Sequence, residues 1–298
     1  MRVVRVGEPI KSGGTIRLHH LTDLHVGAPD FAEPEFRARV SLIADDPGAR
    51  WTMGGDAGDL IRHSDKRYSP TELHERYRLA TDLVLATQEH LVELLAPIAS
   101  KCWGWADGNH ERTVDRAYGG HFGAEVTTML GIQGRFVGYR GFVEVRFAIN
   151  TVRLPLLIDL QHGWQAGRLK GAPLVQAERE LGTSTADVVL RGHNHQPLGH
   201  PFVTLDLTGG GKGSVVRRHR SVINGGTWRL GYRDDLAPIN PRKLSEVEGD
   251  LWSETKGFRA EPLGGPVLAL RVVKGDGAPS GIEHSIISGE INARTLGL

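Results

Sequence analysis

The sequence predicts an α/β fold, and three observations support this prediction. Segments with the pattern of buried strands alternate with segments whose apolar residues recur at helical spacing. Residue types that bind metals follow several of these strands directly, as expected where the carboxyl ends of strands line one crevice. The length of 298 residues is within reach of one large domain, so we expect a single hydrophobic core.

The strands are predicted from short runs of β-branched, aromatic and other apolar residues that end at glycine or polar residues. Two neighbouring runs, residues 142–149 and 152–160, are expected to belong to a second sheet. Sequence after Pro201 is rich in such runs, and three glycines at 209–211 mark a turn or loop. The expected strands are residues 15–22, 50–54, 102–106, 142–149, 152–160, 188–190 and 267–273.

Three helices are predicted from apolar residues that recur every three or four positions. In the second, Ser69-Pro70-Thr71-Glu72 is typical of a helix start, because proline fits the first helical turn. Pro97 is expected to close the same helix, since proline cannot donate to the helical hydrogen-bond ladder. The expected helices are residues 33–44, 73–94 and 169–181.

Composition excludes several classes of protein. With 39% hydrophobic and 24% charged residues, the chain is unlike a disordered or fibrous protein. A formal net charge of +1 provides no global field toward nucleic acid or an anionic membrane, so such a partner would have to be held locally. The first 14 residues contain no continuous apolar stretch, and the single cysteine, Cys102, cannot form an internal disulfide. We therefore expect no membrane contact and a cytoplasmic location.

Five short motifs in fixed order carry the chemical information. Each contains histidine, aspartate or asparagine, the residue types that supply nitrogen and oxygen ligands to divalent metals. Together they offer enough ligands for two neighbouring ions. The motifs are Asp23-Leu24-His25, Gly55-Asp56-Ala57-Gly58-Asp59, Gly108-Asn109-His110-Glu111, Gln161-His162-Gly163 and Gly192-His193-Asn194-His195.

The spacing within the motifs suggests how the ligands divide between two metals. Asp23 and His25 are separated by one residue at a strand end and suit a common ion, and His195 of the fifth motif would bind the same ion. Asp56 follows two glycines that allow a sharp turn, so its carboxylate could bridge two cations that are about 3.5 to 4 Å apart. The second ion would take His162 and His193.

The third motif offers three different side chains. Asn109 supplies a neutral carbonyl oxygen that a hard or borderline metal accepts. The adjacent His110 must point differently and is the candidate for a proton donor or a phosphate contact. Glu111 is expected to anchor the loop. Taken singly, a Gly-Asp pair is more typical of an Asx turn or a helix cap, and an isolated histidine is more typical of a structural residue.

As an ordered set, the five motifs resemble those of the calcineurin-like metallophosphoesterases. The resemblance spans residues 23–195 and implies a four-layer α/β/β/α sandwich, with the metals above the sheet edges, and one domain over residues 1–298. Residues 234–298 would be a β-rich extension of unknown role. The first metal takes Asp23, His25, Asp56 and His195, and the second takes Asp56, Asn109, His162 and His193. Gln161-His162-Gly163 is the weakest match because the motif is so short, and the affinity of the second metal depends on the assignment of His162.

The resemblance also implies a mechanism. Two divalent ions would lower the pKa of a bound water from about 16 towards about 7 and bind the phosphate oxygens. Manganese is the favoured metal, with iron, zinc and magnesium as alternatives. His110 corresponds to the general acid of the family, and Asp59 and Glu111 would orient the ligands. The chain is thus expected to be a metal-dependent phosphoric ester hydrolase.

The substrate is harder to predict, because the shared site serves many phosphate esters. Asp23-Leu24-His25-Val26-Gly27 resembles the first motif of Mre11 and SbcD-type nucleases, which favours a phosphodiester in DNA or RNA. Arg62, His63 and Arg112 are candidate substrate contacts, as is the cationic run at 217–220, although such clusters are more often solvated surface. A phosphomonoesterase or small-nucleotide hydrolase is the first alternative. A non-catalytic binding or assembly subunit with the same fold is the second.

Overall fold

The computed structural model describes residues 1–60, 75–77, 80–164, 169, 171–207, 213–231, 260–274 and 281–287. In these residues, twelve strands form two mixed six-stranded sheets. The order in the first sheet is β1-β6-β7-β8-β10-β9, and the order in the second is β12-β11-β2-β3-β4-β5. The first sheet consists of β1 (Arg2–Pro9), β6 (Arg140–Ile149), β7 (Val152–Gln161), β8 (Val188–Arg191), β10 (Val215–Gly225) and β9 (Pro197–Leu207). The second consists of β12 (Gly281–Ile287), β11 (Val267–Val273), β2 (Thr15–Leu21), β3 (Ala49–Gly54), β4 (Cys102–Ala106) and β5 (Phe136–Gly138).

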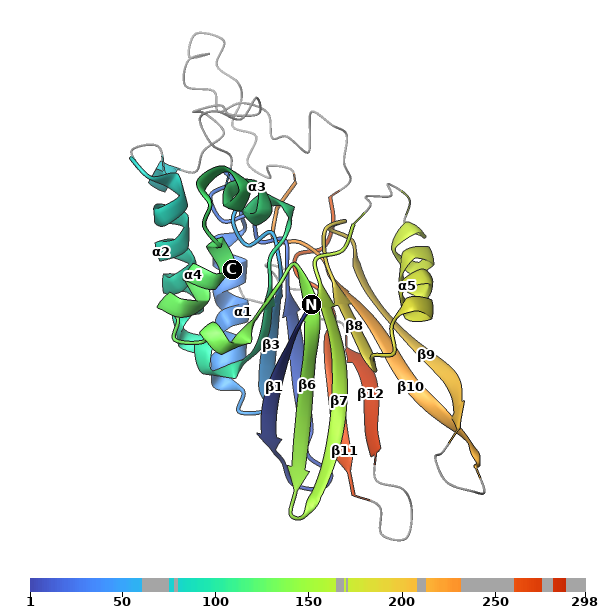
Figure 1. Cartoon of the computed structure of the whole chain (residues 1–298). Helices are drawn as coiled ribbons and strands as arrows, with labels where there is room; N and C mark the ends of the chain where they lie inside the picture. The colour runs from blue at the N-terminus through green and yellow to red at the C-terminus, as the bar shows by residue number, and fades with distance from the viewer. Residues whose placement is uncertain are drawn as a thin grey trace.

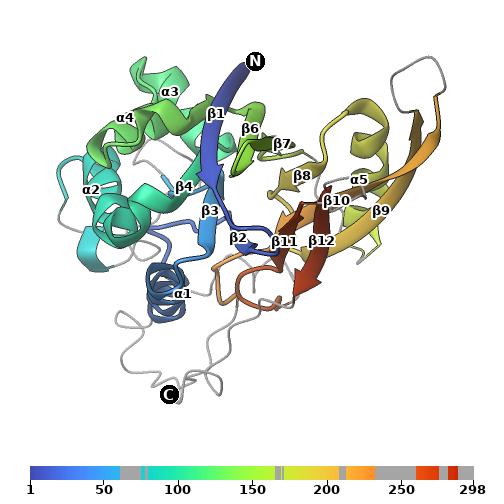
Figure 2. The same ribbon diagram turned by 90° about the horizontal axis from the view of Figure 1, so that it is seen from below.

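The two sheets pack face to face, with helices on both outer faces (Figures 1 and 2). Helices α1, α2 and α4 cover the second sheet, and α5 covers the first. The helices are α1 (Glu33–Asp45), α2 (Leu83–Leu95), α3 (Asn109–Tyr118), α4 (Phe122–Met129) and α5 (Ala172–Thr183), with 3₁₀ turns at Glu75–Tyr77, Ala96–Lys101 and Gln133–Arg135. The predicted α/β/β/α sandwich is therefore confirmed.

Each interface between layers is a continuous apolar cluster. Val143 and Leu160 of the first sheet pack with Leu18 and Leu268 of the second, because alternate side chains of a strand point to the same face. Between the second sheet and its helices, aromatic residues such as Trp51 fill the core and are fully buried. Within the described residues, no helix is both long and apolar enough to span a bilayer.

The predicted helix over residues 73–94 is wrong in its first half. Helix α2 begins only at Leu83, because the side chain of Asp82 accepts hydrogen bonds from the amides of Val84 (2.9 Å) and Leu85 (3.0 Å) and caps the helix there. Tyr77 belongs to a separate 3₁₀ turn, although it still packs in the core that the apolar pattern indicated. The proposed start at Ser69-Pro70-Thr71-Glu72 lies outside the described residues.

The other predicted strands and helices are confirmed to within a few residues, and the clear strand near the carboxyl end is β11. It pairs antiparallel with β2, so residues of the proposed C-terminal extension complete the second sheet beside the first motif. The sequence did not reveal β1, which pairs in parallel with β6, or the helices α3 and α4.

Candidate metal centre

Five strand ends of the two sheets position the predicted ligands. In the second sheet, β2, β3 and β4 are parallel neighbours, so the chain leaves all three at the same edge. Asp23, Asp56 and Asn109 follow these three ends within three residues. In the first sheet, β7 and β8 are also parallel neighbours, and His162 and His193 follow them within two residues. Sequence segments that are far apart thus deliver their polar side chains to one edge of the sandwich.

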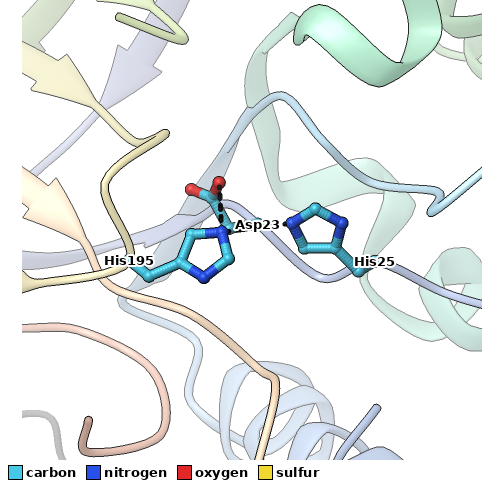
Figure 3. Close-up of side chains that lie close together, drawn as sticks. All are labelled: Asp23, His25 and His195. Carbon is cyan, nitrogen blue, oxygen red and sulfur yellow. Dashed lines mark hydrogen bonds and ion pairs between the residues drawn. The ribbon is translucent and has the colours of Figure 1, made fainter. Parts of the chain in front are cut away.

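The first group of side chains is Asp23, His25 and His195 (Figure 3). The Nε2 atoms of His25 and His195 are 3.2 Å apart, and Oδ1 of Asp23 is 3.4 Å from Nε2 of His195. These atoms come from two different segments and point at one common position. The side chain of Asp23 is fully buried, and its Oδ1 atom has no hydrogen-bond partner.

The second group is Asp56, Asn109, His162 and His193. Nε2 of His162 lies 3.2 Å from Oδ2 of Asp56, 3.1 Å from Oδ1 of Asn109 and 3.2 Å from Nδ1 of His193. Nδ1 of His193 is 2.9 Å from the same asparagine oxygen. The two groups touch, because the backbone amide of His193 donates to Oδ2 of Asp23 at 2.9 Å. All seven predicted ligands therefore lie in one continuous cluster.

This donor set fits divalent metal ions. Two atoms that are each about 2.1 Å from one ion lie roughly 3.0 to 3.4 Å apart, which matches the separations in both groups. Oδ1 of Asp23 is a buried carboxylate oxygen without a hydrogen-bond partner, and it lies next to two imidazole nitrogens that are 3.2 Å apart. A cation held between them would satisfy all three atoms.

Hydrogen bonds on the outer side of the histidines select the tautomer that a metal ligand requires. Nδ1 of His162 donates to the carbonyl oxygen of Gly54 at 2.8 Å, and a carbonyl can only accept. In the neutral ring, Nε2 of His162 then carries a lone pair directed at Asp56 and Asn109. Similarly, Nδ1 of His25 is 3.1 Å from Oδ1 of Asp59, which leaves Nε2 facing His195.

Burial and neighbouring charges shift the pKa values of histidines in the cluster. Burial alone lowers the pKa of His162, but the negative charge of Asp56, its hydrogen bond and the charge of Asp23 outweigh burial and raise that pKa to about 10. Burial lowers the pKa of His25 to about 4 despite its bond to Asp59. Without a cation, one proton in the second group is therefore held between Asp56 and His162, where a metal would displace it.

Backbone strain is concentrated in the same cluster. Among the described residues, seven residues other than glycine have a positive φ, a conformation that is costly for side chains with a Cβ. Each such residue costs of order 1 to 3 kcal/mol, and this kind of strain gathers at functional sites. Five of the seven are predicted ligands: Asp23, His25, Asp56, His193 and His195.

Two glycines allow the loops to approach each other closely. A Cβ at Gly108 would collide with the Asp56 carboxylate, and a Cβ at Gly192 would collide with Thr22 and with the Asp23 carboxylate. Both glycines belong to the predicted motifs. Their role is thus steric: each removes a side chain where another loop presents its carboxylate.

Glu111 ties the second and third motifs together. It is fully buried on α3, where Oε2 accepts from the amides of Asp56 (3.1 Å) and Gly108 (2.8 Å). Its Oε1 accepts from the amides of Ala57 (2.6 Å) and Gly58 (3.2 Å). One carboxylate therefore satisfies four backbone donors and fixes the loop that carries Asp56.

For Glu111→Ala we expect a free energy of unfolding lower by about 3 kcal/mol or more, since four amides lose their acceptor and each unsatisfied buried group costs about 1 to 3 kcal/mol. Urea denaturation followed by circular dichroism measures this change. The matched control is Glu178→Ala, which removes an exposed carboxylate from α5. Equal stability of the two variants would contradict the anchoring role.

His110 and Asp59 lie at the edge of the first group. The ring centroids of His110 and His25 are 4.8 Å apart, and Nδ1 of His110 donates to the backbone carbonyl of Asp59. Burial opposes protonation of His110, but the charges of Asp56 and Asp59 dominate and raise its pKa. His25, Asp59 and His110 also form a third group of close metal-type atoms.

The structure adds three residues that sequence reasoning missed, namely Arg229, Asp30 and Tyr139. Arg229 follows β10 and pairs with Asp30 at 2.8 Å, and its Nη1 atom lies 3.8 Å from Oδ1 of Asp59. Tyr139 stands edge-on to His162, with ring centroids 6.1 Å apart, and its hydroxyl donates to the carbonyl of Gly163 at 3.1 Å. None of the three belongs to a motif or to a recognisable spacing, so no signal in the sequence could have found them.

The candidate substrate contacts have different outcomes. Arg112 is exposed on α3, beside the cluster. Arg62 and His63 lie outside the described residues. Two of the four residues in the cationic run at 217–220 serve packing instead: Arg218 pairs with Asp187 at 2.7 Å, and Arg220 is buried and donates to backbone carbonyls.

The four-layer sandwich, with the ordered motifs at the carboxyl ends of its parallel strands, matches the architecture expected from the motif resemblance. This is the architecture that the resemblance to the calcineurin-like metallophosphoesterases implies. The finer likeness to Mre11 and SbcD-type nucleases stays a prediction.

Comparison with known proteins gives matches among solved structures only. No family model and no curated protein matches the chain. Vacuolar protein sorting 29 from Cryptosporidium parvum is 15% identical, with a TM-score of 0.34, over 92% of this chain and 98% of that chain. The calcineurin-like phosphoesterase YfkN from Bacillus subtilis is 13% identical, with a TM-score of 0.34, over 92% of this chain and 90% of that chain.

A further similar structure is the NAD nucleotidase of Haemophilus influenzae. It is 10% identical, with a TM-score of 0.40, over 93% of this chain and 51% of that chain. At these identities and TM-scores, the similarities carry no information about the activity of this chain.

Proposed function

We propose that this protein is a binuclear metal-dependent phosphoesterase that hydrolyses phosphodiester bonds with a metal-activated water. The observation that carries the proposal is the convergence of Asp23, His25 and His195 with Asp56, Asn109, His162 and His193 at metal-ligand separations. Asp56 is assigned to both ions, the first three residues to one ion and the last three to the other. When bound, the ions supply an activated water and neutralise the phosphate oxygens.

The mixed donor set supports manganese as the metal. Carboxylate and amide oxygens suit hard ions such as Mg²⁺ and Mn²⁺, whereas imidazole suits Zn²⁺ and iron. Each group here combines imidazole nitrogens with oxygen donors. Mn²⁺ accepts both kinds of ligand, so it is the metal we propose.

His110 is the proposed proton donor. Its Nδ1 is occupied by the carbonyl of Asp59, and the raised pKa favours the cationic ring, whose remaining N–H can protonate a departing alkoxide. Asp59 and Arg229 hold His25 and His110 in position through the contacts described above. Glu111 fixes the backbone at Asp56 by accepting a hydrogen bond from its amide.

A nucleic acid strand is the substrate we propose within the phosphodiester class. The support is the exposed Arg112 beside the cluster and the likeness of the first motif to nucleases. A strand carries further phosphates besides the one that is cleaved, and a guanidinium beside the metal centre could bind one of them. A non-catalytic assembly subunit would not require a proton donor beside the metal ligands, and His110 stands there against His25.

One assay tests the proposal. Protein supplemented with Mn²⁺ is offered single-stranded DNA, duplex DNA, a bis-aryl phosphodiester and an aryl phosphomonoester. We expect turnover of the diesters that exceeds monoester turnover and is abolished by a chelator. Turnover of the monoester alone would support the first alternative. Two bound metal equivalents without turnover of any ester would overturn the enzyme proposal in favour of an assembly subunit.

A further inference from the structure

A hollow of about 410 Å³ lies beside the metal centre, between α3, β5 and the start of β1. Its volume is within the range of small-ligand sites. Three arginines line it: Arg2 at the start of β1, and Arg112 and Arg116 on α3. All three side chains belong to exposed residues. Arg112 and Arg116 are four residues apart on α3 and therefore share one face of that helix.

Two of these arginines, Arg2 and Arg112, lie over aromatic rings and not beside carboxylates. The guanidinium carbon of Arg112 is 5.5 Å from the ring centroid of Tyr139, and that of Arg2 is 5.3 Å from the ring centroid of Phe136. In the part of the chain that the structure describes, none of Arg2, Arg112 and Arg116 has a side-chain ion pair or hydrogen bond. A ring below a guanidinium orients it and leaves its N–H edge free for an anion.

Two carboxyl groups also border the hollow, and both are engaged elsewhere. Oδ1 of Asp115 accepts from the amide of Phe122 at 2.8 Å, and its Oδ2 is 3.7 Å from Nδ1 of His121. Asp107 is only 3% exposed and accepts from the indole of Trp105 at 3.3 Å. The exposed charge of the hollow is therefore positive, although the whole chain has a formal net charge of only +1.

The hollow and the metal centre share one wall. Tyr139, which lies under Arg112, also stands edge-on to the ligand His162. Its hydroxyl bond to the carbonyl of Gly163 fixes the ring between the two sites. The guanidinium of Arg112 is thus one aromatic ring away from the proposed ligands, close enough for one substrate to reach both.

We propose that this hollow is a second anion subsite, where Arg112, Arg116 and Arg2 hold a phosphate group of the substrate other than the one that is cleaved. The proposal rests on the proposed function. It narrows the substrate to compounds that carry a second phosphate group besides the one at the cleaved bond. An oligonucleotide, cleaved at a phosphodiester bond, and a nucleoside polyphosphate, cleaved at a phosphoanhydride bond, both carry such a group, whereas a simple diester does not. Guanidinium groups suit the role because they bind phosphate oxygens in bidentate fashion.

The experiment compares the wild-type protein with the double variant Arg112→Ala and Arg116→Ala, both loaded with Mn²⁺. Substrates are a thymidine dinucleotide with a 5′-phosphate, the same dinucleotide without it, a nucleoside triphosphate and a bis-aryl phosphodiester. We expect KM for the 5′-phosphorylated dinucleotide to rise by about tenfold or more for each guanidinium removed. Values of kcat/KM for the bis-aryl diester and the unphosphorylated dinucleotide should change by less than about threefold.

Arg179→Ala is the matched control, because it removes an exposed arginine from α5, away from the hollow. A KM increase confined to the dinucleotide identifies an oligonucleotide as the source of the second phosphate. An increase confined to the triphosphate identifies a nucleoside polyphosphate. Equal KM values for variant and wild type, with bis-aryl turnover intact, would overturn the subsite and leave the phosphoesterase proposal standing.

Calorimetric binding separates the two proposals if no ester is turned over. The probe is a 5′-phosphorylated dinucleotide with an uncleavable methylene linkage, titrated into the metal-loaded protein. Binding that is weakened by the double variant but not by Arg179→Ala would support the subsite even for a non-catalytic protein. Absence of binding to the wild type, or equal binding to the variant, would overturn it.

Discussion

Asp56→Asn is expected to lose both bound metal and activity, with turnover of a bis-aryl phosphodiester lower by about 10³-fold or more. Loss of the carboxylate charge removes several kcal/mol of metal binding and charge stabilisation, and each 1.4 kcal/mol is tenfold in rate. Oδ2 of Asp56 lies 3.2 Å from Nε2 of His162, and Oδ1 accepts from the amide of His110 at 3.0 Å. An asparagine keeps the shape but presents one neutral oxygen.

Metal content by elemental analysis and steady-state turnover measure this prediction. Asp45→Asn makes the same chemical change at an exposed position at the end of α1 and should keep two metal equivalents and full activity. An Asp56→Asn protein that retains two equivalents would contradict the bridging assignment. Circular dichroism checks that the variant is folded.

His110→Asn should lower turnover of an ester with a poor, alkoxide leaving group by about 10² to 10⁴-fold while metal content is kept. An aryl leaving group departs without protonation, so its turnover should fall by less than about tenfold. The side chain of His110 is 12% exposed, and its Nδ1 is engaged by the Asp59 carbonyl. Asparagine retains a polar donor there but cannot supply an acidic proton.

The pH profile provides a second measure of the same role. Since the charges of Asp56 and Asp59 raise the pKa of His110 against the effect of burial, the acid form persists to a higher pH than in a free imidazole. Wild-type turnover of the alkyl ester should decline as the pH rises through that raised pKa, and the variant should lack this decline. His219→Asn, at an exposed position on β10, is the control. Equal losses for both leaving groups would refute the acid role.

Local sequence patterns predicted the elements whose apolar residues are the ones buried in the fold. β4 and β11 lie at the predicted residues because their continuous apolar runs are buried almost throughout in the sheet. The predicted α2 starts too early because the apolar spacing extends back to Tyr77, whereas the helix begins after Asp82, whose side chain caps its first backbone amides. Periodicity reports burial, and Tyr77 is buried without being part of the helix.

The sequence did not reveal β1 or α3, and both depend on contacts with remote segments. β1 buries only two apolar residues, Val4 and Val6, and it is a strand because β6, more than a hundred residues later, offers it a parallel edge. α3 starts inside the third motif, where Glu111 satisfies the amides of the neighbouring loop. Neither contact leaves a trace in nearby sequence, since both partners are remote along the chain.

By itself, the sequence determined the identity and order of the seven candidate ligands, because metal coordination requires particular donor atoms and these residue types can be read directly. Tertiary structure alone decided that Asp23 and His193 touch, that Nδ1 of His162 points at Gly54, and that Arg2 lies near Arg116. Such proximity arises from how parallel strands register within two packed sheets. That register is set by burial and backbone hydrogen bonding over the whole chain, so no local segment encodes it.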